Sequence, residues 1–74
     1  MQITIKLFAT LRNQRFKVEV QEYPEGSSVK DVASALDIQE EDLAIILVNG
    51  RDADLDTILV NDAVLCFFPP VGGG

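Results

Sequence analysis

The sequence contains no histidine and no tryptophan, and cysteine occurs once, at Cys66. Without histidine the chain cannot form a Ser-His-Asp or Cys-His catalytic centre, nor a zinc site ligated by imidazole. A single cysteine also excludes an internal disulfide framework. Cys66 lies in the apolar run of residues 64–68, so we interpret it as a strand residue and not as a nucleophile. The sequence therefore predicts neither a catalytic centre nor a metal site in this chain.

Basic residues are also scarce, with six Lys and Arg against twelve Asp and Glu, which gives a net charge of −6 and a pI near 4.2. A charge of this sign repels nucleic-acid phosphates and anionic membranes, so we expect a basic protein partner and neither nucleic acid nor membrane. The sequence has no apolar run of about eighteen residues and no signal-peptide pattern at its first residues. We therefore expect a cytoplasmic protein.

Alternating apolar and polar residues predict the first part of the fold. The 74 residues, of which 47% are hydrophobic, fit one small domain stabilised by packing. Residues 2–7 alternate with a period of two, which is typical of a strand with one buried face, and residues 16–21 repeat the pattern. We expect these two segments to form an antiparallel hairpin.

A helix is predicted next, over residues 29–36, where apolar residues recur at i, i+3, i+4 and i+7. Ser28 stands three residues before Asp31, which is a capping-box signal for the helix start. The apolar stripe should cover the inner face of the hairpin. Residues 39–42 are acidic, and we interpret them as a solvated turn or short helical turn without a site role.

The remaining pattern predicts a third strand over residues 43–48, a tight turn at Asn49 and Gly50, a short fourth strand and a last strand over residues 64–68. If the first and last strands lie side by side, the fold is an α+β β-grasp, the ubiquitin-like fold. It would have a mixed sheet of about five strands with one main helix on one face. Periodicity alone leaves a meander with a packed helix as the alternative.

The chain ends in "FFPPVGGG", residues 67–74. Glycine loses more backbone freedom on folding than any other residue, so three successive glycines predict a mobile thread. The two prolines have no N–H to donate and should end the sheet pairing. We therefore predict a β-grasp domain at residues 1–68 and a flexible C-terminal tail at residues 69–74.

Three stretches together resemble the MoaD family, the small subunit of molybdopterin synthase, within the MoaD/ThiS ubiquitin-like sulfur carriers. They are "KLFATLR", "VNGRDADLDTIL" and "FFPPVGGG". The most specific element is the Pro-Pro-Val-x-Gly-Gly ending, matched by residues 69–74. The chain departs from the family at residues 61–63, where Asn-Asp-Ala replaces the usual Asp-Gly-Asp turn.

The resemblance implies that Gly74, preceded by Gly73, carries the chemistry. A MoeB/ThiF-like enzyme would adenylate the Gly74 carboxylate with ATP, and the adenylate would become a thiocarboxylate. Gly74 would then donate sulfur to precursor Z in a MoaE-like large subunit, for the molybdopterin dithiolene of the molybdenum cofactor. The chain would be a co-substrate subunit of a hetero-oligomer and no enzyme itself, with no bound cofactor and with adenylate and sulfur carried covalently.

A docking surface is predicted from the strand alternation. If residues 3, 5 and 7 face the helix, then Phe8 and Phe68 point to the open face of the sheet and form an apolar patch there. Alternatively, loops cover one or both rings. The surface arginines Arg12 and Arg51 are not assigned to the site. The predicted partner-binding residues are Phe8, Phe68, Pro69, Pro70, Val71 and Gly72.

Three other functions remain open. A ThiS-like carrier of the thiamine pathway also ends in Gly-Gly, although "FATLRN" and "FFPPV" favour the molybdenum pathway. A ubiquitin-like protein modifier would use the same activated Gly74 but transfer it to a lysine of a target. In a plain β-grasp binding module, the glycine tail would be inert.

Overall fold

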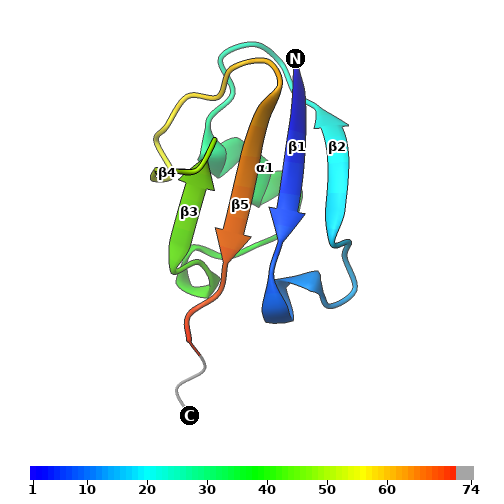
Figure 1. Cartoon of the computed structure of the whole chain (residues 1–74), viewed down its shortest axis with the longest axis vertical. Helices are drawn as coiled ribbons and strands as arrows, with labels where there is room; N and C mark the ends of the chain where they lie inside the picture. Colours follow the sequence, from blue (N-terminus) through cyan, green and yellow to red (C-terminus); the bar gives the residue numbers. More distant parts are fainter. Residues whose placement is uncertain (72–74) are drawn as a thin grey trace.

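The computed structural model describes residues 1–71 (Figure 1). It contains five strands, one α-helix and two short 3-10 helices. In chain order they are β1 (Gln2–Leu7), η1 (Ala9–Arg12), β2 (Val18–Glu22), α1 (Val29–Ala35), η2 (Glu40–Asp42), β3 (Ile45–Val48), β4 (Arg51–Asp52) and β5 (Ala63–Phe68).

The five strands form one mixed sheet in the order β2-β1-β5-β3-β4. The first and last strands, β1 and β5, are parallel neighbours, whereas the other pairs are antiparallel. A meander would pair consecutive strands throughout, so this order confirms the predicted β-grasp. Figure 1 shows α1 behind the sheet, with no described element crossing the front face. Within residues 1–71, no helix is both long and apolar enough to span a membrane.

The core lies between the sheet and α1. Alternate residues of β1 and β5 point toward α1 and are fully buried, as the period-two pattern predicts for β1. Each such aliphatic or aromatic side chain contributes roughly 1.5–3 kcal/mol when it leaves water. The fully buried large side chains are Ile3, Ile5, Leu7, Val29, Val32, Leu65 and Phe67.

The start of α1 has the predicted capping box. The Asp31 N–H donates to Ser28 Oγ at 3.3 Å, and the Ser28 N–H donates to Asp31 Oδ2 at 2.9 Å. The helix buries Val32 and Ala33 and ends at Ala35, one residue before the predicted end. The short acidic segment that follows forms η2, in agreement with the predicted helical turn.

The turn between β3 and β4 is also as predicted. Asn49 and Gly50 have φ values of 52° and 81°, which the left-handed turn requires and which glycine and asparagine tolerate best. The Asn49 side chain accepts a hydrogen bond from the Val64 N–H at 2.9 Å, so the turn is fixed to β5.

The second strand differs from the prediction, because it spans Val18–Glu22 and not residues 16–21. Phe16 lies before the strand and packs against the core, and a bend at Lys17 then breaks the alternation. Val18 pairs with Lys6, and Val20 with Thr4, so both valines lie on the open face. They are 51% and 57% exposed. The helix therefore does not cover the apolar residues of β2.

Candidate functional site

An aromatic pair marks the end of the sheet from which the tail leaves. Phe8 follows β1 and Phe68 ends β5, and parallel neighbours end at the same edge. The Phe8 N–H donates to the Phe67 carbonyl at 3.2 Å. The rings of Phe8 and Phe68 are stacked with centroids 4.2 Å apart and an interplanar angle of 10°. Both are half-buried, so the structure brings the two residues together as predicted.

Arg12 lies against the Phe8 ring of this pair. Its Nε donates to the Leu7 carbonyl at 2.7 Å, and its Cζ lies 5.4 Å from the centroid of the Phe8 ring. The 3-10 turn of η1 brings Arg12 back to the end of β1, which sequence reasoning missed. The contact could have been predicted from the spacing, because Arg12 stands four residues after an aromatic residue at the end of a strand. Arg51, in contrast, lies exposed in β4, and β3 and β5 separate it from β1.

We expect Arg12→Ala to lower the free energy of unfolding by about 1–2 kcal/mol, because it removes a charge-assisted hydrogen bond and a cation–π contact at a half-exposed site. Arg51→Ala, the matched control, should change it by less than about 0.5 kcal/mol. Urea unfolding followed by circular dichroism measures both values. Equal unfolding midpoints for the two variants would show that Arg12 does not support the aromatic pair.

Strand β3 enlarges the apolar surface beside the aromatic pair. Ile45 pairs with Phe68, and Leu47 pairs with Cys66, so these four side chains share the open face. Ile45 is 49% exposed, and Cys66 is a half-buried strand residue as predicted. The sequence pattern did not predict the contribution of β3, because residues 45–48 are all apolar and do not alternate. We call Phe8, Ile45, Leu47, Cys66 and Phe68 the open-face patch.

The tail leaves β5 at the same edge, between η1 and η2 (Figure 1). The Ala44 N–H donates to the Phe68 carbonyl at 2.8 Å. Beyond it, Pro69 is half-buried and Pro70 is exposed, and Val71 is 95% exposed. Of the predicted site residues, Gly72, Gly73 and Gly74 lie outside the described residues.

A metal-binding group of side chains would be another basis for function. Within residues 1–71, no three or more Cys, Asp or Glu side chains come together in a group that could hold a metal ion. The arrangement instead presents an apolar patch beside the exposed residues Pro70 and Val71. A partner protein could cover the patch and take the tail into its own pocket.

Comparison with known proteins agrees with this arrangement at the level of the fold. SAMP1 from Haloferax volcanii is 26% identical, with a TM-score of 0.82 and coverage of 100% of both chains. A putative molybdopterin converting factor subunit 1 from Pyrococcus furiosus is 29% identical over 96% of this chain and 99% of that chain, with a TM-score of 0.79.

A chain in the complex of subunits 1 and 2 of the molybdopterin-converting factor from Helicobacter pylori 26695 is also similar. It is 21% identical to this chain over the whole length of each, with a TM-score of 0.69. That identity shows the fold alone. No curated protein matches the sequence significantly. The ThiS family model, however, matches residues 5–74. This chain therefore belongs to the ThiS family, within the MoaD/ThiS group of ubiquitin-like carriers that its sequence resembles.

Proposed function

We propose that this chain carries sulfur on Gly74 for the synthesis of the molybdopterin dithiolene. The observation that carries the proposal is the Gly-Gly ending of a ThiS-family chain, which follows the exposed residues 70–71 beside the open-face patch. The chain is then a co-substrate, and a partner supplies the catalysis. It carries adenylate and sulfur covalently and binds no cofactor of its own.

The chemistry requires activation because an α-carboxylate is ionised at neutral pH and is a poor electrophile. The carboxylate of Gly74 attacks the α-phosphate of ATP, and pyrophosphate leaves. A sulfide-level nucleophile (HS⁻) then attacks the acyl carbon, AMP leaves, and loss of the proton from sulfur gives the thiocarboxylate. Gly73 and Gly74 suit this step because they lack a Cβ, so the extended terminus can enter a narrow channel near a nucleotide phosphate.

Delivery of the sulfur requires both the patch and the tail. From Pro69 onward, six residues reach at most about 20 Å when extended. This reach is sufficient for Gly74 to react inside a partner's pocket while the open-face patch docks outside it. Pro69 and Pro70 stiffen the exit and, with Val71 and Gly72, approach the partner.

The proposed partners are a MoaE-like large subunit, which holds precursor Z, and a MoeB/ThiF-like adenylating enzyme. The likeness to subunit 1 of the Pyrococcus furiosus molybdopterin converting factor supports the first. One dithiolene needs two sulfurs, so two carriers serve each product. The assembly is a cytoplasmic hetero-oligomer.

A second candidate function is protein modification, which is favoured by the likeness to SAMP1, the small archaeal modifier protein 1 of Haloferax volcanii. The modifier and the carrier share adenylation of Gly74 and differ in the final acceptor, which is a lysine for the modifier. A ThiS-like role in the thiamine pathway also uses the thiocarboxylate, with another acceptor.

The acceptor decides between these functions. We expect the thiocarboxylated chain, mixed with a MoaE-like subunit and precursor Z, to return to the carboxylate form as the dithiolene is formed. The dithiolene is measured after oxidation to its fluorescent derivative. Formation of an isopeptide-linked conjugate in cell extract, with no dithiolene in the reconstituted mixture, would instead support the modifier.

A further inference from the structure

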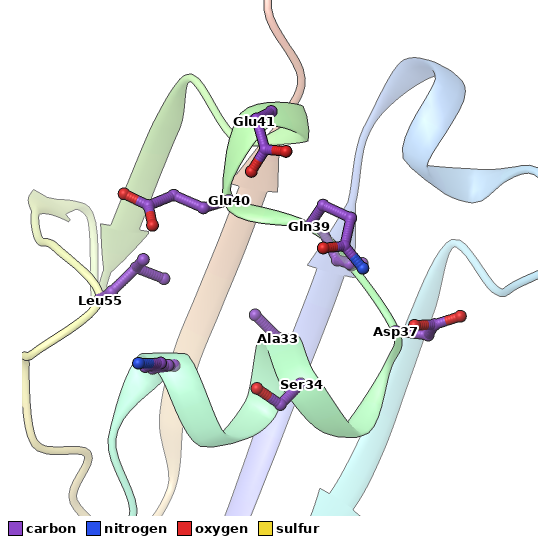
Figure 2. Close-up of a pocket in the computed structure, with 9 residues that line it drawn as sticks. Ala33, Ser34, Asp37, Gln39, Glu40, Glu41 and Leu55 are labelled. Atoms are coloured by element: carbon purple, nitrogen blue, oxygen red, sulfur yellow. The ribbon is translucent and has the colours of Figure 1, made fainter.

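A groove lies on the helix side of the molecule, away from the open-face patch. It consists of two adjoining cavities of about 390 and 520 Å³, which share Lys30, Glu40 and Leu55. Figure 2 shows the first cavity between α1 and η2, with Ala33 facing η2 and Leu55 at one side. The second cavity continues along Leu43 and Ile46 of the sheet side. Each volume lies in the range of about 300–1,000 Å³ that is usual for ligand pockets.

Backbone hydrogen bonds fix the walls of this groove. The Lys30 N–H donates to the Leu55 carbonyl at 2.9 Å, and the Ala53 N–H donates to the Ile46 carbonyl at 2.9 Å. On the other wall, the Leu43 N–H donates to the Glu40 carbonyl at 3.0 Å. A preformed groove binds with less loss of conformational entropy than one that must be ordered.

The groove combines an apolar floor with an acidic rim. Leu43, Ile46 and Leu55 are half-buried and form an accessible aliphatic floor. The lining carboxylates are Asp37, Glu40, Glu41, Asp54 and Asp56, and the one lining cation is Lys30. Within residues 1–71, the one ion pair joins the Met1 amino group to Glu25, so none of the lining carboxylates forms an ion pair in that part of the chain.

We propose that this groove docks a basic segment of a partner protein, whose aliphatic side chain enters between Leu55 and Leu43 while its Lys and Arg side chains meet the carboxylate rim. Charge complementarity selects this occupant, because an acidic or neutral segment would leave five clustered carboxylates without counter-charges. The groove reaches Ala44, whose N–H bonds to the end of β5. A partner that receives the tail can therefore occupy the groove at the same time.

The probe is the amidated peptide Arg-Lys-Leu-Leu-Arg-Lys, titrated into the isotope-labelled full chain and followed by NMR. We expect the amide shifts to concentrate at residues 30, 40, 43 and 55. Glu40→Lys combined with Asp56→Lys should weaken binding by about tenfold. The matched control, Glu22→Lys with Glu25→Lys, changes the net charge by the same amount but should change the dissociation constant much less. Leu55→Ser, which makes the floor of the groove polar, should also weaken binding of the peptide.

Three results would overturn the proposal: no shifts at the groove, shifts centred on the open-face patch, or equal weakening by the two double variants. Equal weakening would show that only net charge attracts the peptide. Replacing the two leucines of the peptide with serine must also weaken binding, and unchanged affinity would contradict the role of the apolar floor. Unfolding midpoints confirm that each variant is folded. The titration does not involve the Gly74 carboxylate, so its outcome is independent of the proposed sulfur chemistry.

Discussion

Deletion of Gly73 and Gly74 should abolish activation of the chain by its adenylating enzyme. The truncated chain still ends in a carboxylate, but that group would be two residues short of the reacting phosphate, about 7 Å if the tail is extended. Release of pyrophosphate from ATP, measured with the activating enzyme and the purified chain, should fall to the level without the chain. The free energy of unfolding should change by less than about 0.5 kcal/mol, because β5 ends at Phe68.

A chain with one residue appended after Gly74 is the control for length. It keeps both glycines but displaces the reactive carboxylate, so it should be equally inactive. The extended and the truncated chains would then show the same loss of pyrophosphate release, because in both the terminal carboxylate is displaced from the position of Gly74. If the truncated chain still supports pyrophosphate release, the tail is inert, and the plain binding module becomes the better explanation of this protein.

Phe8→Asp should weaken binding to the activating enzyme or the large subunit on the order of 100-fold. Loss of a buried aromatic side chain at the centre of an interface commonly weakens binding by this factor. Aspartate at position 8 would also remove the stacking of the Phe8 and Phe68 rings, whose centroids are 4.2 Å apart. Binding is measured by isothermal titration calorimetry with the purified partner. Phe8 follows β1 and is half-buried, so the variant is expected to fold.

Val20→Asp is the matched control for Phe8→Asp. Val20 lies on the same open face and is 57% exposed, but it belongs to the edge strand β2, where it pairs with Thr4, four residues before Phe8. The same charge introduced there should change the dissociation constant by less than about threefold. Comparable losses for the two variants would mean that the whole open face, and not the open-face patch, contacts the partner.

Local patterns predicted the elements well where one face of an element is buried. Residues 2–7 alternate because β1 packs against α1 on one side only, and Ser28 and Asp31 form their capping box from local geometry alone. The face of the sheet to which each side chain of β2 points could not be predicted in the same way. It depends on the bend at Lys17, which turns Val18 toward the open face although Phe16 packs against the core.

The candidate site was predicted in part, for a related reason. Once β1 and β5 are neighbours, alternation places Phe8 and Phe68 at one edge, and the structure confirms their contact. Arg12 reaches the pair only through the turn of η1. The sequence did not predict the groove. The residues that form its walls, around Glu40 and Leu55, are far apart in the sequence and come together only through tertiary packing.

The most direct test of sulfur carriage is the intact mass of the chain after incubation with its activating enzyme, Mg-ATP and a sulfur source. Fragmentation of the C-terminal peptide then locates the change. We expect one oxygen to be replaced by sulfur at Gly74. An unchanged mass, with an enzyme that is active on a known carrier, would contradict sulfur carriage by this chain.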